Sequence, residues 1–325
     1  MTLRLDLRLI DASDLGDTER VKKLLDEGAD IHFRNGGATA LVGAARNGRT
    51  ETAILLIERG ANIQIENDAP LYWACAGGFV ETAAALIDRG ADLHAGYDRV
   101  LRLAAEGGLV DMVSLLLARG ADVHAQDPMD PRQALHSAAL YGRTEVLSLL
   151  LDAGADINSQ CGRALYDATA NGYMDAARTL ISRGADVHAQ SEGPLRIAAL
   201  KGWASNVELL LDHGADANAF GHGALDHAAT GCHEEVVAIL LRRCEFPASL
   251  LTSARAYAHQ RGATAVVAVF DAFEQMQALA RVSTSPPTAA PAPALAPAPA
   301  PAPAPSPSVP PIPSPTPKRS TPWRL

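Results

Sequence analysis

The octapeptide RGADVHAQ stands at residues 119–126 and returns unchanged at residues 183–190. Chance rarely duplicates eight residues within one chain, so the repetition indicates a structural unit that is copied along the sequence. Related five-residue motifs begin at residues 28, 60, 90, 120, 154, 184 and 214, and read GADIH, GANIQ, GADLH, GADVH, GADIN, GADVH and GADAN. Most intervals between them are 30 residues, with one of 32 and one of 34. The sequence is therefore an array of short repeats.

Each repeat carries two short amphipathic patterns. The runs VSLLLARG at 113–120 and ALHSAALYG at 134–142 place apolar residues at helical spacing, and each run ends in glycine. Glycine adopts positive φ at little cost and can therefore stop a helix. Helices of about ten residues are marginal alone, and they gain stability when their apolar stripes stack on neighbouring units. The sequence therefore predicts an all-α solenoid of about nine helix pairs.

Two stretches that each cover most of a repeat, ALHSAALYGRTEVLSLLLDAGADIN at 134–158 and PLRIAALKGWASNVELLLDHGADAN at 194–218, resemble ankyrin repeats. The resemblance covers residues 3–281, with seven full copies and two atypical ends. Ankyrin units usually span about 33 residues, so most units here are shorter than the family pattern. The missing residues fall where the family forms a β-hairpin finger, and we therefore expect shortened fingers. Cys232 and Cys244 replace the usual capping glycine, which we expect to strain or shorten those helix ends.

The ends of the array differ from its middle. Residues 3–27 form a more charged helix pair, with Lys23 where later units have leucine, as an exposed terminal face requires. Residues 246–281 keep the two-helix plan with a longer first helix, and we expect them to cap the array. These limits give one ankyrin-repeat domain at 1–281. Residues 282–325 form a Pro/Ala/Ser-rich tail with 16 of the 21 prolines, which cannot continue a helix or build a core and is expected to be disordered.

Charge and composition argue against several classes of protein. Residues 1–281 carry 25 Lys and Arg against 37 Asp and Glu, so no nucleic-acid groove is expected. Charges interrupt the apolar runs of the N-terminus, and no run approaches the roughly 18 apolar residues of a membrane span, so we expect neither a signal peptide nor a membrane anchor. The four cysteines form no C-x-x-C motif and are predicted to be free thiols. We expect a cytoplasmic, monomeric protein, with a nuclear or host-cell destination left open.

The sequence offers no catalytic or metal-binding pattern. It contains no G-x-S-x-G, G-x-G-x-x-G, phosphate-binding G-x-x-x-x-G-K-[ST] or H-E-x-x-H motif. His222, His227 and His233 lie close in sequence but fall on a loop, a helix and a turn without a partner motif, so no metal and no cofactor are expected. His136 matches the histidine of the family's T-P-L-H pattern, which the resemblance implies to be a hydrogen bonder between repeats. Trp73 is expected to pack between units.

A partner-binding surface is predicted on the first helices and on the longest finger. The resemblance implies that proteins bind the fingertips and the concave face of the first helices. The 34-residue interval contains AQDPMDPRQ at 125–133, a finger stiffened by two prolines. Most positions just before the turn glycines are small or polar, but a few are large and apolar or aromatic, as in an interface hot spot. The candidate partner-binding residues are Met129, Arg132, Leu140, Tyr141, Leu200, Lys201 and Trp203.

Together these features predict a non-enzymatic protein–protein interaction scaffold with an ordered body and a Pro-rich arm. The alternative is a substrate-recruiting adaptor or host-directed effector that uses the arm as a second docking segment, with KRSTPWRL at 318–325 as the strongest candidate motif. A spacer role for the arm, an incidental long finger and an enzyme with an unfamiliar site are the further alternatives.

Overall fold

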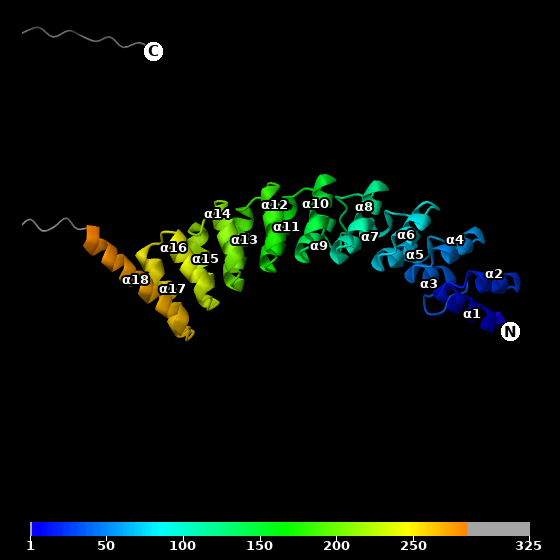
Figure 1. The fold of residues 1–325 in the computed structure, drawn as a ribbon, viewed down its shortest axis with the longest axis horizontal. Coiled ribbons are helices and arrows are strands. Elements are labelled where there is room, and N and C mark those ends of the chain that lie inside the picture. Colours follow the sequence, from blue (N-terminus) through cyan, green and yellow to red (C-terminus); the bar gives the residue numbers. More distant parts are fainter. Residues whose placement is uncertain (1, 285–325) are drawn as a thin grey trace, which may run out of the picture. The chain divides into compact units, whose positions relative to one another are not determined.

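The computed structural model describes residues 2–284, with side chains described for residues 4–219 and 223–279. These residues form nine consecutive helix pairs, as the repeats predict (Figure 1). The first helices are α1 (Thr2–Leu15), α3 (Ala40–Arg46), α5 (Ile65–Ala76), α7 (Ala95–Gly107), α9 (Ala134–Leu140), α11 (Ser159–Ala170), α13 (Ala189–Lys201), α15 (Ala219–Thr230) and α17 (Ala248–Gln260). The second helices are α2 (Thr18–Asp26), α4 (Thr50–Glu58), α6 (Val80–Ile87), α8 (Val110–Ala118), α10 (Thr144–Asp152), α12 (Met174–Ser182), α14 (Ala204–Asp212), α16 (Glu234–Arg243) and α18 (Thr264–Thr284). Residues 1–278 form one compact unit, whereas the prediction for the Pro-rich tail lies outside the described residues.

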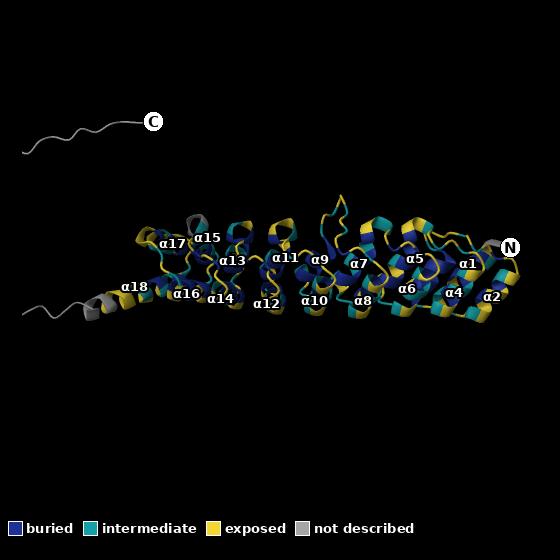
Figure 2. Cartoon of the chain, turned by 90° about the horizontal axis from the view of Figure 1, so that it is seen from above, coloured by how far each residue is buried: buried dark blue, intermediate teal, exposed yellow. Residues whose placement is uncertain are grey.

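The helix pairs stack in two layers. From α1 to α17 each first helix packs against the next first helix, and from α2 to α16 the second helices do the same. Buried residues run continuously between the two layers (Figure 2). One leucine at a fixed position of the first helix is buried in each full unit, namely Leu41, Leu71, Leu101, Leu135, Leu165, Leu195 and Leu225. Because burying one leucine contributes about 1.5–3 kcal/mol, this row holds together helices that are too short to persist alone.

Side-chain hydrogen bonds between units hold the turns in register. In four units the residue after the left-handed turn residue, which is glycine in three of them and Cys232 in the fourth, bonds to a backbone carbonyl of the preceding unit. The pairs are Arg49 Nε to Asp14 at 3.2 Å, Arg143 Nε to Glu106 at 3.0 Å, Trp203 Nε1 to Ala170 at 3.2 Å and His233 Nε2 to Leu200 at 2.9 Å. Each such bond contributes about 1 kcal/mol, and together they fix the spacing at which the first helices are presented.

The units differ in the segment that leads into the first helix. Two of the described units have a finger closed by a β-bridge, between Asn35 and Ala38 in one and between Asp127 and Asp130 in the other. In four other units three consecutive residues adopt left-handed φ and ψ instead, and these residues are 66–68, 96–98, 160–162 and 190–192. A left-handed turn thus replaces the finger in the 30-residue units. The expectation of shortened fingers is confirmed, and a second finger at the 32-residue interval was missed.

Two of the left-handed turns are tied to the next unit by a buried carboxylate. Asp68 Oδ1 accepts the backbone N–H of Asp92 at 2.8 Å, and Asp98 Oδ1 accepts that of Asp122 at 3.0 Å. An L-residue in left-handed conformation costs roughly 1–2 kcal/mol, so the turn persists only where neighbouring contacts offset that strain. At the same position a third turn has Gly162, for which the conformation carries no side-chain strain.

Some details at the ends of helices differ from the prediction. In the C-terminal pair α17 has 13 residues without a left-handed turn, against seven in α3 and α9, which agrees with the longer first helix that was expected; its second helix, α18, has 21 residues. Lys23 is exposed on α2, as predicted for a terminal face. Cys232 adopts φ 61°, which is the strained cap that was expected, whereas Cys244 is extended with φ −127° and ends α16 without a left-handed residue.

Candidate partner-binding face

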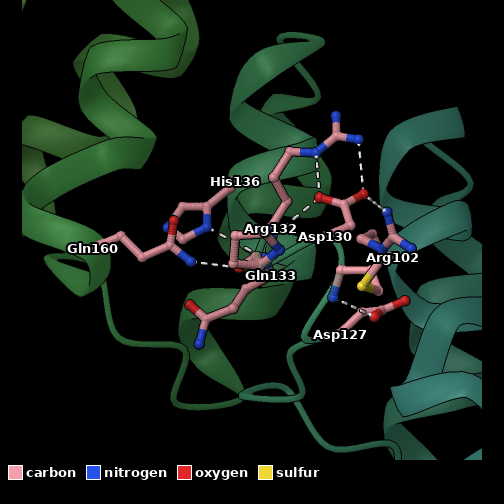
Figure 3. A network of polar contacts seen from close by, with 9 residues as sticks. Arg102, Asp127, Asp130, Arg132, Gln133, His136 and Gln160 are labelled. Carbon is pink, nitrogen blue, oxygen red and sulfur yellow. Dashed lines mark hydrogen bonds and ion pairs between the residues drawn. The ribbon is translucent and has the colours of Figure 1, made fainter.

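The long finger is built on a network of arginines and carboxylates (Figure 3). The Asp130 carboxylate accepts hydrogen bonds from Arg132 Nε and Nη2 at 2.9 Å each, and it pairs with Arg102 of the preceding unit. The bond from Arg132, with the added charge of Arg102, lowers the pKa of Asp130 to about 2. At the tip, Asp127 accepts the Met129 N–H at 2.8 Å, and the Met129 residue is 92% exposed. The finger therefore presents an apolar tip on a fixed base.

Arg132 and Tyr141 meet at the foot of this finger. The pKa of Arg132 is raised chiefly by its hydrogen bond to Asp130, and Glu106 and Tyr141 are close enough to contribute. The carboxylate of Glu106 in turn raises the pKa of the Tyr141 hydroxyl. Tyr141 lies at the C-terminal end of α9 with its ring partly exposed, next to the partly buried Leu140. The structure thus places Arg132 and Tyr141 near each other, with Leu140 next to Tyr141 in the chain, whereas Met129 lies at the exposed tip of the same finger.

The other three predicted residues form a separate group at the end of α13. Leu200 and Lys201 are exposed there, and α11 lies between this helix and α9. The Trp203 ring covers Gly172, where an added Cβ would lie 2.8 Å from it, and its Nε1 bonds to the preceding unit. One face of Trp203 therefore holds two units together, while 41% of the residue remains exposed.

A cleft beside this second group contains residues that the sequence analysis did not select. It measures about 260 Å³ and is lined by Tyr166, Gln190, Gly193, Arg196, Ile197, Leu200 and His227. Only Leu200 of this set was predicted. A signal was present in the sequence, because Gly193 and Gly223 occupy the position at which two other units have Arg99 and Arg163. Glycines in two consecutive units, at a position that carries arginine or glutamine in three other units, leave space between neighbouring first helices.

Two further side chains test predictions about packing between units. Trp73 is 41% exposed and lies edge-on to Tyr72 of its own helix with ring centroids 5.3 Å apart, so it is not buried between units as expected. His136 is fully buried: its Nδ1 accepts the Gln133 N–H at 3.2 Å, and its Nε2 lies 3.1 Å from Ser159 Oγ of the next unit. This arrangement confirms the predicted hydrogen bond between repeats. Burial lowers the pKa of His136 to about 4, so the ring is neutral with its proton on Nε2.

The described side chains do not form a metal centre. Among residues 4–219 and 223–279, no three His, Cys, Asp or Glu side chains converge on a point that an ion could occupy. His227 and His233 bond instead to the backbone carbonyls of Gly223 and Leu200, and the side chain of His222 lies outside the described set. Within residues 2–284 no helix has the length and apolar character that crossing a membrane requires.

Comparison with known families identifies the repeat. A family model for ankyrin repeats in three copies matches residues 9–96 and 101–191, which together make up more than half of the chain. The protein therefore belongs to the ankyrin-repeat family, whose repeats generally serve as protein–protein interaction modules. No curated protein was found to match the chain.

Proposed function

We propose that this protein is a non-enzymatic interaction scaffold whose partner docks on the first helices and on the long finger. The observation that carries the proposal is the preorganised finger, in which Asp130 is held from both sides while Met129 stands exposed at the tip. A rigid base lowers the entropy that binding must remove, and Met adapts to irregular apolar surfaces. Tyr141 at the foot of the finger adds the aromatic component typical of an interface hot spot.

In this proposal Met129, Leu140 and Tyr141 supply the apolar contacts, and Arg132 supplies a donor that Asp130 orients. Leu200, Lys201 and the exposed face of Trp203 form the rim, one unit further along than α11. The partner then spans three consecutive first helices, which the regular inter-unit hydrogen bonds keep at constant spacing.

A photo-crosslinking experiment with the full chain tests this proposal. A photoreactive residue is placed at Met129, at Tyr141, or at the exposed Asp175 on α12 as a control on the other layer. We expect one and the same protein to be crosslinked from positions 129 and 141 and not from 175. The double variant Arg132→Glu/Tyr141→Ala, in which position 129 still carries the crosslinker, should lose this product while its circular dichroism stays unchanged. An equal yield from position 175, or a product that survives the double variant, would remove the proposal.

A further inference from the structure

We propose that the cleft between α11, α13 and α15 binds an acidic linear segment of the partner, with Arg196 as the ion-pair partner of one carboxylate. An apolar side chain next to that carboxylate packs against Ile197 and Leu200. The inference rests on the proposed function and specifies the chemistry of the partner. It depends on three features of the cleft, which are its open space, its unpaired guanidinium and the charge around it.

The space exists because one helix position lacks a side chain. In α7 this position is Arg99, whose guanidinium lies 4.0 Å from the ring centroid of Tyr72 in the preceding unit. In α13 the same position is Gly193, and a Cβ added there would lie 2.9 Å from Gln190 Cβ and 3.3 Å from the Tyr166 ring, so a longer side chain does not fit without displacing them. The Tyr166 ring therefore has no arginine of the following unit upon it, as Tyr72 has, and the guanidinium of Arg163 on its own helix lies farther away, at 5.8 Å from the ring centroid. An apolar or planar group of a partner can occupy this uncovered part of the cleft.

Arg196 lines this cleft, and no carboxylate of the described residues pairs with its guanidinium. Arg102, Arg132 and Arg163 each pair with an aspartate of the array. Arg196 has only a long hydrogen bond of 3.4 Å from Nη1 to the Ser191 carbonyl, and no ion pair joins it to any described residue. Its stem crosses the space above Gly223, where an added Cβ would lie 3.3 Å from Arg196 Cδ and Nε. A second glycine thus leaves the guanidinium room to meet a carboxylate in the forked geometry that arginine favours.

Two buried carboxylates close to the cleft each engage a basic side chain of the array through one oxygen, and Asp226 on α15 adds a third carboxylate beside the lining residue His227. Asp167 is buried and accepts a hydrogen bond from Arg163 at 2.8 Å, and Glu192 is buried with His188 Nδ1 2.5 Å from it. Lys201 adds an exposed positive charge at the end of α13. Arg196 and Lys201, which have no ion pair to any described residue, are therefore the charges here that a negative segment can meet, although the body as a whole is acidic.

The negative charges of the second-helix layer disfavour binding of an acidic segment on that side. Two of the three second helices beside the cleft begin with exposed carboxylates, Asp175 on α12 and Glu235 on α16, whereas α14 has none in its first turn. These charges suit the helix N-termini but repel an acidic ligand. An acidic segment is thus directed to the first-helix layer, and charge complementarity favours this occupant over a basic one.

Selection from a random 12-residue peptide display library on the full chain tests the inference. We expect enriched peptides to carry Asp or Glu beside a bulky apolar residue. A fluorescently labelled enriched peptide should bind Arg196→Gln at least about tenfold more weakly than the parent, because a charge-assisted bond is lost. Arg178→Gln, which makes the same charge change on α12, should bind like the parent.

Further variants keep the test decisive. Gly223→Gln places in the cleft the residue found at the corresponding position 133, retains Arg196, and should weaken binding to a similar degree. Circular dichroism shows whether each variant is folded. Enriched peptides without excess acid, or unchanged binding to Arg196→Gln, would overturn the inference. So would a single-stranded oligonucleotide of equal length that binds more tightly than the peptide and depends on Arg196.

The outcomes separate this inference from the proposed function. Peptides that ignore Arg196→Gln but are lost on Arg132→Glu/Tyr141→Ala would refute the acidic-segment inference and leave the scaffold function standing. Peptides that are insensitive to both sets of variants would refute both. Failure to enrich any peptide would refute the inference alone, because the crosslinking experiment tests the larger surface independently.

Discussion

The left-handed turns make an unusual prediction: replacing Cys161 by glycine should stabilise the protein. Cys161 is exposed and has φ 57° and ψ 45°, within the turn at 160–162. Glycine at a right-handed helix position destabilises by about 1 kcal/mol relative to alanine. In left-handed conformation the sign reverses, because an L-residue is strained there by roughly 1–2 kcal/mol and glycine is not. Glycine also makes the unfolded chain more flexible, which offsets about 0.5–1 kcal/mol of the relieved strain. We therefore expect the free energy of unfolding to rise by about 0.5–1 kcal/mol.

Two control substitutions in the same protein calibrate this prediction. Gly162→Ala, at φ 73° in the same turn, introduces the same strain and places a Cβ 2.4 Å from that of Ala189, so it should destabilise by more than about 2 kcal/mol. Arg178→Gly, in the right-handed and exposed part of α12, should destabilise by about 1 kcal/mol.

Urea denaturation followed by far-ultraviolet circular dichroism measures all three substitutions. Long repeat arrays can unfold in parts, so the midpoints are compared at one protein concentration and one pH. We expect the midpoint to rise for Cys161→Gly and to fall for the other two. If Cys161→Gly lowered the midpoint as much as Arg178→Gly, residues 160–162 would be right-handed and the account of the short units would fail.

Three further predictions concern single side-chain contacts within and between units. The pKa of His136 is held at about 4 by burial, below its usual value of about 6.5, so the unfolded chain takes up the proton first and stability is lost as the pH falls from about 6.5 to 4. His136→Asn should flatten this part of the stability–pH curve, and an unchanged curve would contradict the buried neutral ring. His188 behaves oppositely, because its bond to Glu192 raises its pKa and its stabilisation is lost as the pH rises through the folded pKa. His188→Gln should therefore lower the urea midpoint at pH 6 and have little effect at pH 9, and the reverse order would show that the pair does not form. Trp203→Phe keeps a ring over Gly172 but removes the bond to Ala170, so it should cost about 1 kcal/mol, whereas an unchanged midpoint would mean that this bond contributes nothing.

The helical architecture could be predicted from the sequence because it depends on local and repeated signals. Apolar spacing marks each helix, glycine marks each stop, and the recurrence of both reveals the stacking. The inter-repeat role of His136 also followed, because it is carried by one side chain at a fixed register. The finger at 125–133 could be found because two prolines and the longest interval mark it.

The features that were missed depend on neighbouring units. No residue type is common to all four left-handed turns, and L-residues at 66–68 or 190–192 give no sign of positive φ, because tertiary contacts impose it. The exposure of Trp73 depends on which way its helix faces the next one. The cleft at Arg196 likewise arises from two glycines in consecutive units, and it becomes visible only when the units are aligned position by position.

A left-handed turn and a bridged finger join the same two elements, so loop length varies in this array without a change in the stacked layers. A unit with a turn, such as that at 96–98, is then an acceptor site into which a recognition loop could be grafted by inserting a few residues. Diversification of such a protein needs no redesign of its core, because new binding specificity can be added at one unit while the adjoining units keep theirs.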